Sequence, residues 1–162
     1  MSDDLDATGF HGDIVFGKRP GALGMKYNGV VARKLDLIGQ HVSRLRGLTP
    51  LTRATLENDF FLRSGIERTL QVCIEAMIDV ANRIICLENR PVSTDSFASL
   101  RQLQDLHVLA DAERYRNMIK FRNLIVHRYE QIDTDILVMV VNQCLDDFDH
   151  FTREVEQHER QG

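Results

Sequence analysis

The residues best suited to chemistry lie within one stretch, 121–130, in which Arg122, His127 and Tyr129 follow an Arg-x4-His-x-Tyr spacing. A planar guanidinium can hold a phosphate through paired hydrogen bonds and stabilise the charge that develops on it. A histidine titrates near neutrality, so it can move the protons of an RNA 2′-hydroxyl and of its leaving group. Arg122 and His127 together would suffice for metal-free RNA cleavage that leaves a 2′,3′-cyclic phosphate end.

The same segment carries further cations that could hold RNA. The chain has a net charge of -4, whereas affinity for nucleic acid usually depends on an electropositive surface. Any grip on RNA must therefore be local, and we expect Lys120 and Arg116 to support Arg122 in binding the substrate. Acidic neighbours allow a second interpretation, a solvated helix face of mixed charge. The cations are Arg114, Arg116, Lys120, Arg122 and Arg128, and the acids are Asp111, Glu113 and Glu130.

Other polar residues of the motif also have structural interpretations. Asn123 could orient the phosphate or the imidazole, or it could cap the backbone near a helix end. His127 could be a partly buried histidine that a helix-end carbonyl satisfies, and Tyr129 could pack beside the cleft. Glu75 and Asp79, one helical turn apart, could be an acid/base pair, but they fit better as ion-pair partners of motif-helix arginines. The residue types alone leave these alternatives open.

The spacing of the motif constrains how its members can meet. At about 100° per residue, Arg122 and Tyr129 share a helix face, whereas Arg122 and His127 diverge by roughly 140°. One straight helix cannot bring all three together. Either the helix ends near His127 and the chain turns the imidazole back, or the site is completed across a dimer interface.

The motif and its surroundings resemble the HEPN superfamily, and in particular its HepT-like branch. The likeness includes the Arg-x4-His-x-Tyr stretch and the sequence of the predicted long helix at 67–82. It also includes the downstream segment 129–133 and the apolar helix that follows it and ends near 146–148. It covers roughly residues 27–158. We therefore divide the chain into a flexible N-terminal extension, 1–26, and a HepT-like helical domain, 27–160.

This resemblance implies the toxin of a type VII toxin-antitoxin system, a metal-independent endoribonuclease that cleaves transfer or messenger RNA. Arg122 would hold the scissile phosphate and His127 would act as general base or acid. The resemblance also implies a homodimer with facing motif helices, and an MntA-like nucleotidyltransferase antitoxin that transfers AMP to Tyr129. An adenylyl group would add bulk and negative charge to the RNA cleft. The alternative is a non-catalytic HEPN subunit that binds a minimal nucleotidyltransferase and helps to present its substrate.

Hydrophobic periodicity predicts an all-α, up-and-down bundle of about five helices. Val31, Leu35, Ile38, Val42 and Leu45 mark one stripe of a first helix. A short helix at 51–57 follows, with Thr49 as its N-cap and Pro50 in its first turn. Further patterns predict a helix beginning near Phe97, a motif helix at 112–126, and one C-terminal helix running from after Asp133 to about Val155.

The predicted long helix at 59–88 carries apolar residues on two faces. One stripe contains Ile66, Leu70, Cys73, Met77, Ala81 and Ile84, and the other contains Ile74, Ile78 and Ile85. A helix that is apolar on two faces must be covered on both. We expect its own bundle to cover one face and a second protomer to cover the other.

Composition bounds the remaining possibilities. No apolar run approaches the roughly 20 residues that span a bilayer, and the acidic start is unlike a secretion signal, so we expect a cytoplasmic protein without membrane contact. Cys73, Cys86 and Cys144 are odd in number and lack CxxC spacing, which favours reduced core residues. The histidines show no ligand spacing, so we expect neither a metal nor another cofactor.

Overall fold

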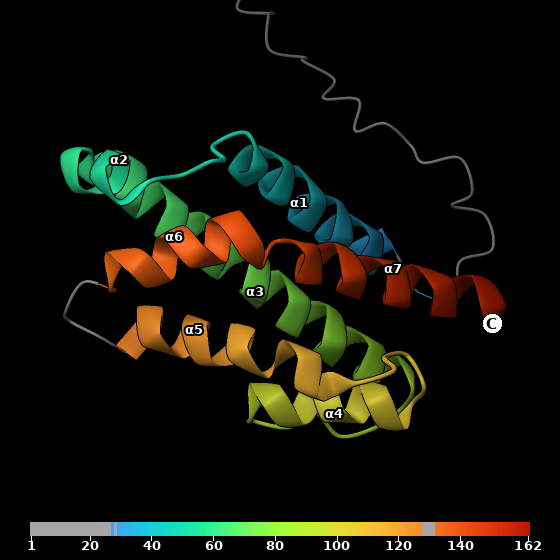
Figure 1. Ribbon diagram of the computed structural model, residues 1–162. Helices are drawn as coiled ribbons and strands as arrows, with labels where there is room; N and C mark the ends of the chain where they lie inside the picture. The colour runs from blue at the N-terminus through green and yellow to red at the C-terminus, as the bar shows by residue number, and fades with distance from the viewer. Residues whose placement is uncertain (1–26, 28, 128–131) are drawn as a thin grey trace, which may run out of the picture.

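The computed structural model describes residue 27 and residues 29–127 and 132–162. Within these residues the chain forms seven α-helices, one 3-10 turn and no strand, which confirms the predicted all-α fold (Figure 1). The elements are α1 (Gly29–Arg46), α2 (Arg53–Asn58), α3 (Phe60–Leu87), α4 (Ser96–Asp105), η1 (Ala112–Tyr115), α5 (Arg116–His127), α6 (Thr134–Gln143) and α7 (Asp146–Gln161). The predicted extension at 1–26 and motif residues Arg128 and Tyr129 lie outside the described residues.

The long helix α3 forms the centre of the bundle (Figure 1). α1 packs along one side of α3 and contacts α7, whereas α4 and α5 pack along the other side. Both apolar stripes are therefore buried within this chain; Ile74 is 2% exposed and Ile85 is fully covered. The expectation that a second protomer covers one stripe was wrong, because α4 and α5 supply that cover.

The first helix follows its sequence pattern closely. All five apolar residues of its predicted stripe are buried. The short helix begins later than expected, because its N-cap is Thr52, whose hydroxyl accepts from the backbone N–H of Thr55. Thr49 instead donates its hydroxyl back to the carbonyl of Arg46 at the end of α1. Asp59 caps α3 by accepting from the N–H of Leu62.

The predicted C-terminal helix is two helices, α6 and α7. The helical pattern stops at Gln143 and resumes at Asp146. Acidic side chains are favourable in the first turn of a helix, where they face the positive end of its dipole. Asp146 and Asp149 occupy that turn of α7 and both bind the Arg46 guanidinium of α1, at 2.6 and 2.5 Å. These ion pairs join the start of α7 to α1 directly after the break, which neither glycine nor proline marks.

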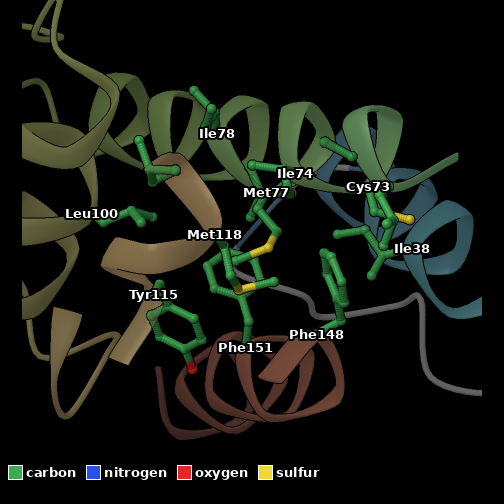
Figure 2. Close-up of a cluster of buried hydrophobic side chains, with 14 of the residues drawn as sticks. Ile38, Cys73, Ile74, Met77, Ile78, Leu100, Tyr115, Met118, Phe148 and Phe151 are labelled. Atoms are coloured by element: carbon green, nitrogen blue, oxygen red, sulfur yellow. The ribbon is translucent and has the colours of Figure 1, made fainter. Parts of the chain in front are cut away.

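The core lies between α3, the start of α5 and α7. Figure 2 shows Met77 and Met118 packed with the rings of Tyr115, Phe148 and Phe151. Tyr115 meets Phe151 edge to face, with ring centroids 5.6 Å apart. Residues 112–127, which form η1 and α5 and are called the motif segment below, therefore begin in the hydrophobic core.

The cysteines do not share one environment. All three are free thiols; Cys73 is buried, Cys144 is half-buried and Cys86 is exposed. The prediction of core residues thus holds for Cys73, where burial raises the thiol pKa to about 12, and is wrong for Cys86. Separately, none of the helices in the described ranges is long and apolar enough to cross a bilayer.

Candidate active site

Helix α5 carries the first two residues of the motif. Asp111 caps the preceding η1 turn by accepting from the N–H of Glu113, and Met118, Ile119 and Phe121 bury the inner face of α5. α5 lies along α3 and touches α4. Its direction is thus set by buried apolar contacts on one face, which leaves the polar residues of its last turns at the surface or at the edge of α3.

Arg122 lies at this edge, and its guanidinium is incompletely paired. Its Nη2 is 3.7 Å from Oε1 of Glu75 on α3, and its Nη1 donates to Oδ1 of the adjacent Asn123 over 3.3 Å. The Nε atom is buried and has no hydrogen-bond partner. A guanidinium has five N–H donors in a fixed fork. The contacts of Arg122 are long and its side chain is 26% exposed, so the protein pairs this guanidinium only weakly.

Two other arginines of the same segment are paired much more closely. Nε of Arg114 lies 2.8 Å from Asp147, and Nε of Arg116 lies 2.6 Å from Glu113. Arg116 also stacks over the ring of Phe97, with its guanidinium carbon 3.9 Å from the ring centroid. Among the described arginines of this segment, Arg122 is the one held loosely against a carboxylate.

The long helix α3 places two polar side chains, Gln71 and Glu75, beside Arg122. Gln71 donates to Glu75 over 2.8 Å, and Glu75 faces Arg122. The expected pairing of Glu75 with a motif-helix arginine is confirmed. Asp79, however, pairs with Lys34 of α1 at 2.7 Å rather than with an arginine of α5.

His127 is the last residue of α5 and is exposed. Residues 128–131, which follow it, lie outside the described residues, so the choice between the two predicted alternatives stays a prediction. Among the described residues of this protomer, no hydrogen bond or ion pair joins His127 to Arg122. Tyr129, the third member of the motif, lies outside those residues.

The three supporting residues are placed differently from one another. Asn123 is exposed, and its Oδ1 accepts a hydrogen bond from Arg122. Lys120 is exposed and lies on the rim of an apolar groove of about 320 Å³ between α5 and α6. Arg116 lies at the other end of α5, roughly 16 Å along the helix axis from His127. The structure thus brings Arg122 and Asn123 together and leaves Arg116 apart.

No group of three or more histidine, cysteine, aspartate or glutamate side chains converges on a common point in the described part of the chain.

Sequence reasoning missed one charged residue beside the motif. Arg63 is 8% exposed and reaches from the first turn of α3 to the start of α6. It donates to the carbonyl of Ile132, to the hydroxyl of Thr134 at 2.6 Å, and to Glu67 at 3.2 Å. The available signal was its position, since Arg63 lies three residues before Ile66 and continues the buried stripe of α3.

Comparison with known proteins gives consistent matches over most of the chain. The family described as Ribonuclease HepT-like matches residues 38–155. The protein named mRNA nuclease HepT from Shewanella oneidensis is 31% identical over 127 residues, which cover 76% of this chain and 94% of that protein. The tRNA nuclease HepT from Aphanizomenon flos-aquae is 22% identical over 131 residues, which cover 80% of this chain and 89% of that protein.

A solved structure shares the fold. It is described as a tri-AMPylated Shewanella oneidensis HEPN toxin in complex with MNT antitoxin, and it superposes with a TM-score of 0.72 at 26% identity. The match covers 80% of this chain and 98% of that chain.

Proposed function

The chain belongs to the Ribonuclease HepT-like family, and on this premise we propose that it is the toxin of a type VII toxin-antitoxin pair, an endoribonuclease that cleaves transfer or messenger RNA without a metal ion. The observation that carries the proposal is the state of Arg122. Its guanidinium is half-covered, restrained by Glu75 at 3.7 Å and left with an unpartnered Nε. Such a group can exchange a weak carboxylate contact for paired hydrogen bonds to a phosphate.

In the proposed reaction, Arg122 binds the scissile phosphate and compensates the charge that builds up on it. His127 accepts the proton of the 2′-hydroxyl, and the 2′-oxygen attacks the phosphorus. The bond to the 5′-oxygen breaks, and that oxygen takes a proton from an imidazolium. The products are a 2′,3′-cyclic phosphate and a 5′-hydroxyl. In a dimer, the two His127 side chains divide the roles of base and acid.

We propose that Asn123, Lys120 and Arg116 support the reaction. Asn123 holds one edge of the Arg122 guanidinium. Lys120 is exposed and available to a neighbouring phosphate, whereas Arg116 would have to exchange Glu113 for RNA. Replacing either cation by alanine should lower the salt dependence of RNA binding by about one unit of slope, which titration at several salt concentrations measures.

A homodimer is the assembly we propose for the active protein. Exposed apolar side chains gather near the end of α5 and the start of α6, where Val126 is 42%, Ile136 38% and Met139 45% exposed. Contact between two copies through this surface would remove these side chains from water. It would also bring two motif ends together, which supplies the second histidine.

The proposed partner is an MntA-like nucleotidyltransferase antitoxin that silences the toxin by transferring AMP to Tyr129. The motif spacing and the tri-AMPylated HEPN toxin among the similar structures support this assignment. An adenylyl phosphate on Tyr129 would compete with RNA for the Arg122 guanidinium. Since RNA and the antitoxin are intracellular, we propose that the protein acts in the cytoplasm.

Cleavage of RNA by the purified, unmodified protein in EDTA tests this function. Wild-type protein should cut total RNA and leave cyclic phosphate ends, whereas the Arg122→Ala and His127→Ala variants should not. Arg46→Ala is the matched control, because it removes an arginine and its ion pairs from α1 and should keep full activity. A folded, unmodified wild type that cuts no RNA would contradict the proposal and favour the non-catalytic interaction subunit.

A further inference from the structure

Arg63 is a buried cation that the proposed reaction does not use. All three nitrogens of its guanidinium are engaged: Nη2 with the carbonyl of Ile132, Nη1 with the hydroxyl of Thr134, and Nε with Glu67. Burying a charge is costly unless it is paired and hydrogen-bonded. A buried arginine that binds a backbone carbonyl constrains the chain at that point more directly than a surface ion pair does.

The place of these contacts along the chain is informative. Ile132 is five residues after His127, the last residue of α5, and three residues after Tyr129. A fully extended chain spans at most about 3.6 Å per residue. His127 therefore lies within about 18 Å, Cα to Cα, of the residue that Arg63 holds. Because Arg63 fixes Ile132, it fixes the chain close after the end of α5.

Helix α6 does not need Arg63 to stay docked. Leu137 and Val141 are buried beneath it, and Asn142 exchanges two hydrogen bonds with the backbone of Leu51, at 2.9 and 2.8 Å. Asp133 caps the helix by accepting from the N–H of Asp135. Loss of Arg63 would thus release the chain locally at Ile132, while the remainder of α6 keeps its own anchors.

From this arrangement we infer that Arg63 is a positioning residue for the motif: α5 fixes the chain up to His127, and Arg63 fixes it again at Ile132. The inference rests on the proposed ribonuclease and AMP-acceptor functions of this site. Arg63 touches neither Arg122 nor His127 among the described contacts, so it acts through the backbone. Its loss should slow steps that need His127 or Tyr129 and should leave phosphate binding by Arg122 unchanged.

The test compares Arg63→Lys and Arg63→Met with a matched control, Tyr115→Phe. The control removes a buried hydrogen bond to Glu154 at the opposite end of α5, far from the anchored chain. Thr134→Val and Thr134→Ser form a second pair, because serine keeps the hydroxyl that accepts from Arg63 and valine does not. All variants are assayed well below their unfolding temperatures.

The Arg63 variants should lower kcat for RNA cleavage by about tenfold or more with KM unchanged, because small misplacements of a catalytic group are costly. They should lower the rate of AMP transfer to Tyr129 by a similar factor. Thr134→Val should show a smaller loss, and Thr134→Ser should restore wild-type values. Tyr115→Phe should keep both rates.

Amide hydrogen exchange supplies a readout that needs no catalysis. In the Arg63 variants, exchange should increase within residues 127–135 and stay unchanged in α1 and α7. If wild-type protein cuts no RNA but this local change appears, the proposed function fails while the anchor stands. Uniform acceleration across all helices, or equal losses of kcat in Tyr115→Phe, would overturn the inference. Should the Arg63 variants fail to fold, the Thr134 pair decides the question alone.

Discussion

The two ends of the motif segment are built on different principles. At its start, Arg114 and Arg116 each contact a carboxylate within 2.8 Å, and the Tyr115 hydroxyl donates to Glu154 over 2.5 Å. At its end, Arg122 keeps a carboxylate at 3.7 Å and His127 is exposed. The polar groups at the start are closely paired within the protein, whereas the groups that we propose to meet the substrate are not.

Burial distinguishes the Tyr115 hydrogen bond at the start energetically from the Arg122 ion pair at the end. Tyr115 is fully covered, and its partner Glu154 also accepts from the backbone N–H of Ala110 at 2.8 Å. A hydrogen bond to a charged group in such surroundings contributes about 1.5–3 kcal/mol. The pair between Arg122 and Glu75 is about a quarter to a third exposed, and pairs of that kind contribute at most about 1 kcal/mol. The start of the segment is therefore expected to govern stability, and the end to govern activity.

The largest expected effect is the loss of catalysis in Arg122→Ala. We expect kcat to fall by about 10²–10³-fold, in the range found when a group that stabilises transition-state charge is removed. The free energy of unfolding should change by less than about 1 kcal/mol. Single-turnover cleavage and denaturant unfolding measure the two quantities. If Arg122→Ala lost enough stability to explain its lost activity, the end of the segment would govern stability as well, which contradicts the proposed difference between the two ends.

Tyr115→Phe should show the opposite pattern. Removing the hydroxyl should lower the free energy of unfolding by about 1.5–3 kcal/mol, since Glu154 loses a buried donor. RNA cleavage well below the unfolding temperature should match wild type. The control is Tyr129→Phe, which removes a tyrosine hydroxyl from the motif itself. Lower kcat in fully folded Tyr115→Phe would place the start of the segment in the catalytic machinery as well.

Alkaline pH should weaken the start of the segment selectively. Burial and then the hydrogen bond to Glu154 raise the pKa of Tyr115 well above its ordinary value near 10. A raised pKa means that the stabilisation is complete below pH 10 and is lost as pH rises from there toward the folded-state pKa. The loss is at most about 1.4 kcal/mol per pH unit for one group. Unfolding curves between pH 8 and 11 should show a decline that is shallower in Tyr115→Phe; Tyr27, whose pKa burial also raises, accounts for part of what remains.

The smallest effect is expected from Glu75→Gln. The change removes a negative charge beside Arg122 and keeps an oxygen that can accept from Gln71. RNA should bind up to about fivefold more tightly, because a partly exposed pair of this kind is worth less than about 1 kcal/mol. Asp79→Asn is the matched control, since Asp79 pairs with Lys34 instead. Equal effects of both changes on RNA affinity would mean that Glu75 acts only through overall charge.

Comparing prediction with structure shows which signals are local. The apolar stripe of α1 and the long helix α3 followed from periodicity, which needs only neighbours within a few turns. The break between α6 and α7 did not, because no glycine or proline marks it and the contacts at the start of α7 come from Arg46, about a hundred residues away along the chain. The cover of the second stripe of α3 was assigned to another protomer for the same reason. Periodicity shows that a face is apolar but not what lies against it.

In the candidate site, too, some properties follow from the local sequence and others depend on contacts between distant residues. The sequence by itself determined the helical class and placed Arg122 and His127 at a fixed spacing near the end of one helix, because these properties depend on residue types and on the helical repeat. Only the tertiary structure decided that Arg122 is loosely paired while Arg114 and Arg116 are closely paired, and that Arg63 holds the chain after the motif. Those outcomes depend on carboxylates, hydroxyls and carbonyls from distant parts of the chain, which meet only once the bundle has packed.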